Sequence, residues 1–355
     1  NWRLLQQRMP AGGECGAVVK ANAYGLGMQP VCSALHQAGC KTFFVANVEE
    51  GVRLRQALPA LAETTVYVLQ GVDAGSERLC TQFRLRPVIV SPAMFERWFN
   101  YCRALDAGPK AFAVKVNTGM NRLGLSLGEL SEVIKRYGSF LKTLQPLLLS
   151  HLACADTPEH PLNALQLERF SGAQSALVSA GVKAKCSFAN SSGLFLPEAF
   201  RKDLSRPGAA LYGVNPTPGS PNPMRRVVSL HLPVLQMHYA KQGDWVGYGG
   251  DAQLARDSVL VTVAGGYADG LARALFPRMC GFAGGIEVPV CGRISMDSVV
   301  FDVTDIAEPA AIKSVEVLGA NIDVDEQAKA AGTIGYEILT GLGERLHRRY
   351  VGGEQ

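Results

Sequence analysis

Short apolar runs alternate with amphipathic stretches along the first two thirds of the chain. Runs rich in β-branched and aromatic residues are typical of strands, and apolar positions at helical spacing between them are typical of helices. Eight such units predict an α/β fold with a parallel sheet, most simply a closed (β/α)8 TIM barrel. An open, doubly wound sheet is the alternative, but no GxGxxG follows the first strand, which disfavours a dinucleotide-binding fold. The expected strands are residues 15–19, 42–47, 65–70, 87–91, 111–117, 146–152 and 184–190, with an eighth near Ser205 and Arg206 or at 210–213.

The pattern changes after a stretch rich in proline, glycine and asparagine, NPTPGSPNP, at 215–223. Beyond it, strand-like runs are separated by glycine-rich turns, which predicts a mostly β C-terminal domain. We therefore expect a barrel domain over residues 1–220 and a β domain over residues 221–355, closed by a helix at 333–347. The β-domain strands are expected at 227–237, 257–266, 287–294 and 298–304, and helices of the barrel at 28–39, 48–58 and 164–181.

Composition fits a large, ordered protein. The 355 residues exceed a typical single domain, and 47% hydrophobic with 19% charged residues allow a large core. The net charge of +4 is spread without basic blocks, so neither nucleic acid nor a membrane is expected as a partner. No apolar run is long enough to span a bilayer. Asn1 opens in helix-like sequence, so we expect residues before it in the natural chain, with a removed targeting segment as one possibility.

The nine cysteines are odd in number, form no CxxC pair and sit mostly among apolar neighbours. This pattern favours reduced, buried thiols over a disulfide framework or a zinc site. Reduced thiols are typical of a cytoplasmic protein, which is the location we expect. No metal site is expected.

Lys20 ends the first apolar strand, CGAVVK, and is followed by ANAYG. Catalytic residues of TIM barrels lie at the carboxyl ends of the strands. A lysine at the edge of an apolar run is partly desolvated, which lowers its pKa and suits Schiff-base chemistry. From position alone, a lysine that extends its ammonium into solvent is the simpler interpretation.

The segments around and after Lys20 resemble a known family. AVVKANAYG (17–25) is similar to the cofactor-lysine segment of the alanine racemases, which are fold-type III enzymes dependent on pyridoxal 5'-phosphate (PLP). Seven further segments follow in the family order and extend the resemblance over nearly the whole chain. They are KVNTGMNRLG (115–124), SHLACAD (150–156), ANSS (189–192), RPGAALYG (206–213), GYADG (266–270), GRISMD (292–297) and YEILT (336–340).

The resemblance implies which residues hold the cofactor, with Lys20 carrying it. Arg206 would face the pyridine nitrogen, and a guanidinium cannot accept a proton, so the ring would stay unprotonated and plain racemisation would be favoured. Outside the family context, turn and capping roles explain Asn190 and Ser191 equally well, and a surface salt bridge explains Arg206. The phosphate would be held by backbone N–H groups of Gly208 and Ala209, the Ser191 hydroxyl, and the phenols of Tyr24 and Tyr350, with Asn190 beside them.

Racemisation needs two bases, one on each face of the substrate Cα. The resemblance implies Lys20 for one face and Tyr267 for the other. Tyr267 would be linked through His151 to Arg206, whose positive charge would lower the phenol pKa. Without the family, His151 is read as a packed core histidine and Tyr267 as a turn residue.

Three residues are implied around the substrate. Arg122 would contact the cofactor's phenolic oxygen and the substrate carboxylate, for which a guanidinium is a bidentate match. Met296 would offer its backbone N–H to the carboxylate, although a core methionine is the simpler interpretation. Lys115 lies seven residues before Arg122 on the same predicted strand, and many family members carry a carbamylated lysine there that positions the arginine.

The resemblance implies a head-to-tail homodimer with shared active sites, because Lys20 lies in the barrel and Tyr267 in the β domain. The expected function is interconversion of L- and D-alanine, which supplies D-alanine for peptidoglycan. A racemase of broader specificity, acting for example on serine, is an alternative on the same fold. A basic amino-acid decarboxylase usually has a glutamate where Arg206 stands, and a non-catalytic PLP carrier has the barrel alone.

Overall fold

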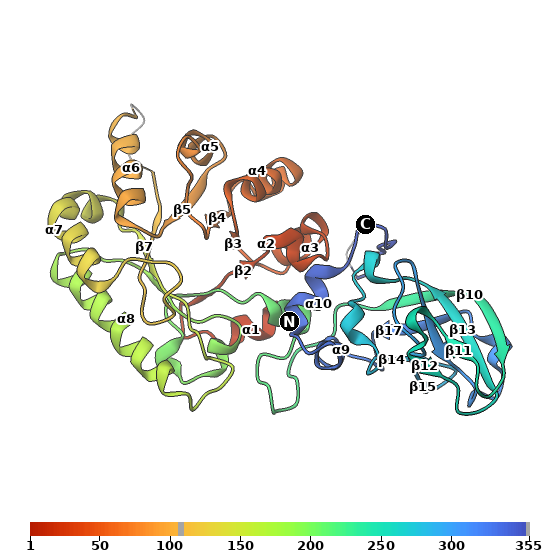
Figure 1. Cartoon of the computed structure of the whole chain (residues 1–355). Coiled ribbons are helices and arrows are strands. Elements are labelled where there is room, and N and C mark those ends of the chain that lie inside the picture. Colours follow the sequence, from red (N-terminus) through yellow and green to blue (C-terminus); the bar gives the residue numbers. More distant parts are fainter. Residues whose placement is uncertain (106–109, 353–355) are drawn as a thin grey trace. The chain divides into compact units, whose positions relative to one another are not determined.

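The computed structural model describes residues 1–105 and 110–352, which form two compact units (Figure 1). The first unit contains most of the chain up to Pro223, and the second contains the chain from Met224 onward. Two short segments, Tyr24–Leu26 and Tyr212–Asn215, also belong to the second unit. The end of the predicted β domain at Gln355 lies outside the described residues.

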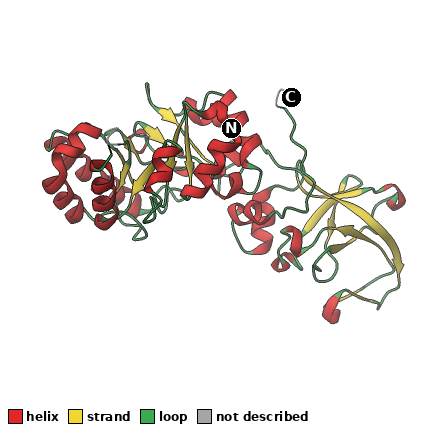
Figure 2. Cartoon of the chain, turned by 90° about the horizontal axis from the view of Figure 1, so that it is seen from above, coloured by secondary structure: helices red, strands yellow, loops and turns green. Residues whose placement is uncertain are grey.

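The first unit is built on a parallel sheet surrounded by helices (Figure 2). Each strand pairs with the next along the chain, and side chains in the strands are almost all buried, as expected for a sheet covered on both faces. The strands are β2 (Ala17–Val18), β3 (Thr42–Val45), β4 (Thr65–Val68), β5 (Leu85–Ile89), β6 (Ala113–Lys115), β7 (Leu147–Leu149) and β8 (Cys186–Ser187). The helices are α1 (Trp2–Gln7), α3 (Met28–Gln37), α4 (Val48–Ala57), α5 (Glu77–Gln82), α6 (Pro92–Arg103), α7 (Leu127–Leu144) and α8 (Pro161–Ser179).

A short parallel pair, β1 (Glu14–Cys15) with β9 (Leu204–Ser205), brings the two ends of this sheet together. Gly16 alone separates β1 from β2, and its N–H donates to the carbonyl of Ser205 at 3.0 Å. On the other side, Arg206 N–H donates to the carbonyl of Ala189, just after β8, at 2.9 Å. The sheet is therefore curled into a barrel, which confirms the predicted fold class. The eighth strand is the one near Ser205, whereas 209–212 forms a 3-10 turn, η4.

The second unit contains a six-stranded antiparallel sheet in the order β15-β14-β17-β10-β13-β16. Its core includes Val261, Phe301 and Val315, which are fully buried. This mostly β architecture confirms the prediction for the C-terminal domain. The strands are β10 (Leu230–Ala240), β13 (Ser258–Ala264), β14 (Cys280–Ala283), β15 (Ile286–Pro289), β16 (Ser298–Asp302) and β17 (Ser314–Leu318), with a separate hairpin of β11 (Trp245–Val246) and β12 (Ala252–Gln253).

Several predicted boundaries in the second unit were wrong. The final helix, α10, covers only Gly335–Gly341, because glycines at 341 and 343 weaken helix continuation. The strand expected at 287–294 ends at Pro289, which cannot donate to a ladder. Helix α9 (Val324–Ala331) and strands β14 and β17 were not predicted.

In the described part of the chain, no helix combines the length and the apolar character needed to cross a bilayer. The nine cysteines carry no disulfide, and six of them are buried.

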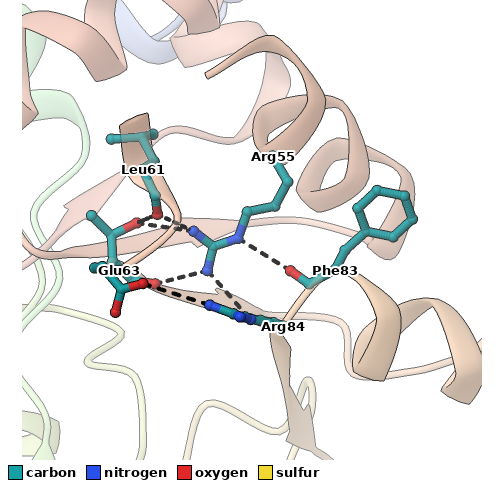
Figure 3. Close-up of polar contacts among 6 residues, drawn as sticks. Arg55, Leu61, Glu63, Phe83 and Arg84 are labelled. Carbon is teal, nitrogen blue, oxygen red and sulfur yellow. Dashed lines mark hydrogen bonds and ion pairs between the residues drawn. The ribbon is translucent and has the colours of Figure 1, made fainter. Parts of the chain in front are cut away.

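Arg55 of α4 ties together the loops that enter β4 and β5 (Figure 3). These loops lie at the amino ends of the strands, the end of a barrel that usually serves stability rather than catalysis. Arg84, in the same region, makes an exposed ion pair of 3.6 Å with Glu63. The Arg55 guanidinium donates to the backbone carbonyls of Leu61, Thr64, Phe83 and Arg84 and to the Thr64 hydroxyl.

Candidate active site

Lys20 lies just after β2, at the carboxyl end of its strand, as predicted. The four residues that follow, Ala21 to Tyr24, form a left-handed helical turn with φ between 52 and 56°. Left-handed backbone costs roughly 1–2 kcal/mol for each residue with a Cβ. Four such residues in succession persist only where neighbouring structure holds them, and strain of this kind is concentrated at functional sites.

Glu50, in the first turn of α4, holds this left-handed turn in place. Its Oε1 accepts a hydrogen bond from Ala21 N at 2.7 Å, and its Oε2 accepts one from Ala46 N, just after β3, also at 2.7 Å. Asn22 Oδ1 adds a third contact by accepting from Met28 N at 2.8 Å. The carboxylate thereby joins the Lys20 segment to the end of the neighbouring strand. Glu50 was not predicted as a site residue; its only mark in the sequence is an acidic position in a first helical turn.

Four basic side chains of the first unit, Lys20, Lys115, Arg122 and Arg206, influence one another and are called the cationic cluster here. Lys115 ends β6 and is buried; burial, then Arg206, Arg122 and Lys20, lowers its pKa to about 8. Burial first, and Arg122 second, also lowers the pKa of Lys20, while Glu50 acts in the opposite direction. The positive charge of the cationic cluster is suited to binding an anionic ligand.

Arg122 does not share a strand with Lys115, contrary to the prediction. Strand β6 ends at Lys115, and Arg122 lies in the loop that follows, where its side chain is exposed. Gly119, with φ of 138°, and Asn121, with φ of 54°, turn the chain out of the extended conformation. Arg122 therefore stands on a loop at the carboxyl end of the strand, where barrel enzymes carry their functional groups.

Arg206 is buried and connects the ends of three neighbouring strands. Its Nη1 donates to Ser187 Oγ in β8 at 2.6 Å, and its Nη2 donates to the carbonyl of Ser150, just after β7. Nη2 also lies 3.5 Å from His151 Nδ1, so the predicted pair of Arg206 and His151 is formed. Burial lowers the pKa of Arg206 to about 10, which leaves it charged at neutral pH. Burial and then Arg206 lower the pKa of His151, so its imidazole is neutral.

Ser191 lies beside the backbone of Gly208 to Ala210, the segment where the phosphate cradle is predicted. The buried Ser191 Oγ accepts hydrogen bonds from Gly208 N at 3.0 Å and from Ala210 N at 3.2 Å. Ala209 begins the η4 turn, where the first amide has no carbonyl of the turn to donate to. Asn190 Oδ1 accepts from Gly193 N at 2.9 Å, which is a capping role beside Ser191.

Gln166 of α8 was not predicted, yet it joins two loops of the site. This fully buried side chain donates from Nε2 to Thr118 Oγ1 at 3.0 Å and to the carbonyl of His151 at 2.9 Å. Its Oε1 accepts from Ala153 N at 2.9 Å. It therefore fixes the loop after β7 against the loop after β6. A polar residue on the buried side of a predicted helix was its only signal in the sequence.

In the second unit, Tyr24 packs against other tyrosines. Its ring lies 4.7 Å from that of Tyr212 and 6.0 Å from that of Tyr336, measured between centroids. Burial first, and Tyr336 second, raises the pKa of Tyr24, so its phenol stays protonated and can donate. Tyr350, by contrast, is exposed and donates to the carbonyl of Leu26 at 2.9 Å. Tyr336 is thus a second phenol near Tyr24, and no role was predicted for it within YEILT.

Tyr267 and Met296 lie on two loops of the second unit that are hydrogen-bonded to each other. Tyr267 opens the short turn η6 (Tyr267–Asp269), and its N–H donates to the carbonyl of Ser295 at 3.0 Å. Ala268 N donates to the carbonyl of Met296, also at 3.0 Å. A Cβ at Gly266 would lie 2.3 Å from the Ser295 carbonyl oxygen, so only glycine fits there. The side chains of Tyr267 and Met296 are 42% and 52% exposed, which leaves both available at the surface of this unit.

Comparison with known families agrees with this arrangement. The family model described as alanine racemase, N-terminal domain, matches residues 1–216, and the one described as alanine racemase, C-terminal domain, matches residues 227–350. The chain belongs to the alanine racemase family. Membership makes it an enzyme of the isomerase class.

Curated alanine racemases and solved structures match along the whole chain. The alanine racemase of Rhodospirillum rubrum is 43% identical, over 99% of this chain and 93% of its own length. A catabolic alanine racemase of Agrobacterium fabrum is 40% identical, over 99% of this chain and 89% of its own. The crystal structure of alanine racemase from Bartonella henselae, with covalently bound pyridoxal phosphate, has a TM-score of 0.92 at 38% identity and covers 99% of this chain and 96% of its own. Family and fold therefore agree over both units.

Proposed function

We propose that the chain interconverts L- and D-alanine with PLP, using Lys20 on one face of the substrate and Tyr267 of the partner subunit on the other. The observation that carries this proposal is the placement of Lys20, His151 and the buried Arg206 after barrel strands, in a chain of the alanine racemase family. Two bases on opposite faces of Cα are what inversion of that centre requires.

PLP fits the groups that the first unit offers. Its ring, when bound, withdraws electrons from the substrate and stabilises negative charge at Cα. Negative charge on its phosphate and phenolic oxygen would offset the positive charges of the cationic cluster. After burial, the mutual repulsion of those positive charges is what lowers the pKa values of Lys20 and Lys115. Ser191 with the amides of Gly208 and Ala209 would hold the phosphate, and Arg122 the phenolic oxygen and the substrate carboxylate. Asn190, Tyr24 and Tyr350 stay predicted supporting residues, and Tyr336 joins them as a further phenol near Tyr24.

Arg206 favours racemisation over decarboxylation or transamination. It is buried, charged and supplies only hydrogen-bond donors, so it cannot protonate the ring nitrogen as a carboxylic acid would. A glutamate in this place, as in a basic amino-acid decarboxylase, would be able to protonate the ring nitrogen. Hydrogen bonds to Ser187 and Ser150 hold the Arg206 guanidinium in place. The neutral His151 beside it would connect the positive charge of Arg206 to the phenol of Tyr267 of the partner subunit.

Lys115 is proposed to be carbamylated. With a pKa of about 8, part of its amine is neutral at physiological pH and can attack carbon dioxide. The nitrogen forms a bond to carbon and releases one proton, which leaves a carbamate anion on the side chain. That anion would lie among Arg206, Arg122 and Lys20, the residues that now oppose the charge of Lys115. Carbamylation would therefore turn a repulsive contact with Arg122 into an attractive one that positions it.

A homodimer with shared sites is part of the proposal. Tyr267 and Met296 are exposed at the surface of the second unit and would complete a second copy's site. The same unit exposes several large apolar side chains, and an accumulation of such side chains is typical of an interaction surface. They include Leu235, Tyr239, Trp245 and Tyr248, each at least 62% exposed. D-Alanine made by such an enzyme would serve peptidoglycan synthesis.

The experiment that tests the function follows exchange and inversion together. The protein, loaded with PLP, is incubated with L-alanine in deuterated water, and optical rotation and deuterium at Cα are measured. Loss of rotation with deuterium at Cα supports the proposal, and Lys20→Ala should abolish both. Release of carbon dioxide, or an absence of exchange despite bound PLP, would contradict it. The same assay with serine in place of alanine measures substrate breadth.

A further inference from the structure

Arg345 joins the two loops of the second unit that carry Tyr267 and Met296. Its Nε and Nη2 donate to the two carboxylate oxygens of Asp269 at 2.9 and 2.8 Å. Its Nη1 donates to Asp297 Oδ1 at 2.7 Å. Asp269 is the last residue of the turn that Tyr267 opens, and Asp297 directly follows Met296. A single guanidinium therefore binds the Tyr267 turn and the Met296 loop at once.

The same turn lies directly against the C-terminal segment from which Arg345 reaches. Gly343 N donates to the carbonyl of Asp269 at 3.0 Å. At Gly270, with φ of 102°, a Cβ would lie 2.2 Å from the carbonyl oxygen of Gly341, so the two backbones meet without room for a side chain. Asp269 Oδ2 also accepts from Gly266 N at 3.0 Å, which closes the turn. The position of the turn thus depends on the segment that Arg345 anchors.

The charges explain why an arginine is needed. Asp269 is buried, and a buried carboxylate requires charged or hydrogen-bonding partners. The hydrogen bonds from Arg345 are the main cause of the lowered pKa of Asp269, so this carboxyl stays ionised at neutral pH. A planar guanidinium can donate to two carboxylates in fixed directions, whereas a lysine ammonium is a point charge on a flexible stem.

We propose that Arg345 is a positioning residue, which fixes the Tyr267 phenol and the Met296 amide relative to each other. The inference rests on the proposed role of Tyr267 as the base for one substrate face. A displacement of about 1 Å at a reacting group can lower a rate on the order of 100-fold. Losing the guanidinium should therefore affect the face that Tyr267 serves and leave the face that Lys20 serves.

The test is Arg345→Met in the PLP-loaded protein, with α-deuterium incorporation measured separately from L- and D-alanine. At saturating substrate, exchange from the enantiomer that Tyr267 deprotonates should fall about 10- to 100-fold, and exchange from the other should stay within about twofold. KM should rise for both enantiomers, because Met296 is proposed to bind the carboxylate. Arg345→Lys should restore only part of the loss. The matched control is Arg256→Met, which removes another bidentate pair of the same unit, with Asp305 at 2.8 and 2.6 Å, and should change neither exchange rate.

An equal fall for both enantiomers, or no change for either, would overturn the inference, because a general loss of folded protein cannot choose one face. If Arg345→Met does not fold, Asp297→Asn replaces it, since that variant keeps the Asp269 pair. It should show the same asymmetry to a smaller degree, and symmetrical kinetics there would also overturn the inference. Failure of the proposed function looks different, because the unaltered protein would then exchange neither enantiomer.

Discussion

Nη2 of Arg206 lies 3.5 Å from Nδ1 of His151; Arg206 is buried and His151 is half-buried. A permanent charge therefore faces an imidazole that could otherwise take a proton near physiological pH. Burial and, after it, the charge of Arg206 set the protonation state of His151, and the consequences can be measured.

We expect His151 to stay neutral as the pH falls through 6.5, because burial and Arg206 lower its pKa well below that usual value. The unfolded chain binds this proton below about pH 6.5 and the folded protein does not, so the free energy of unfolding should fall with acidification through that range. Ring-proton NMR, assigned with His151→Asn, checks the titration. In Arg206→Gln the His151 pKa should rise, and an unchanged titration would contradict the assigned cause.

Mixing two inactive variants tests whether the active site is shared. In a heterodimer of Lys20→Ala and Tyr267→Phe subunits, one site receives both substitutions and the other receives neither. Equal mixing with free exchange of subunits should restore about a quarter of the racemase activity of the unaltered protein. Each variant alone, carried through the same exchange procedure, is the control. If mixing restores nothing although heterodimers form, both bases belong to one chain.

Carbamylation of Lys115 predicts a carbon signal that depends on pH. With 13C-labelled bicarbonate, a carbamate resonance should appear and grow as pH rises through about 8, because the neutral amine is the reactive form. Lys115→Met should remove the resonance, and Lys142→Met, at an α7 position on the protein surface, should not. A resonance that survives in Lys115→Met would place the modification elsewhere.

Glu50→Gln should weaken the turn that follows Lys20. An amide side chain offers one acceptor oxygen where two backbone N–H groups now donate to two carboxylate oxygens. The variant should lose roughly 1.5–3 kcal/mol of the free energy of unfolding, the range for a hydrogen bond to a charged group, and kcat should fall for both enantiomers because Lys20 is displaced. Chemical denaturation and kinetics measure the two effects. A suitable control is Glu129→Gln, whose carboxylate serves only the capping box of α7.

Arg55→Ala should reduce stability without reducing activity. Its guanidinium binds four backbone carbonyls at the amino ends of the strands, away from the catalytic end (Figure 3). We expect a loss of about 2–4 kcal/mol with kcat unchanged at 25 °C. Arg84→Ala removes only an exposed ion pair of the same region and should change stability by about 0–1 kcal/mol. A loss of activity in folded Arg55→Ala would show that this end is coupled to the site.

The sequence predicted most of the barrel because strands such as β3 (TFFV) and β7 (LLL) are apolar runs separated by helical stretches, whereas β8 (CS) and β9 (LS) are too short to be marked by such a run. It predicted the β domain less well, since β14 (CGFA) is short and lacks alternation, and α9 (VDEQAKAA) shows no long apolar stripe. The site residues carried by short segments of the family were predictable. Glu50 and Arg345 were not, because Ala21 and Asp269, which they bind, lie 29 and 76 residues away, and an acidic residue in a first helical turn does not mark such a role for Glu50.

The left-handed turn at Ala21 to Tyr24 has a further consequence for engineering this chain. Glycine at Ala21 or Ala23 would remove a backbone penalty of roughly 1 kcal/mol or more per residue, and would also give the segment beside the reactive amine more freedom. Selection for heat resistance and selection for turnover would thus favour different residues at the same two positions. Alanine at these positions restricts the backbone beside Lys20 to fewer conformations than glycine would.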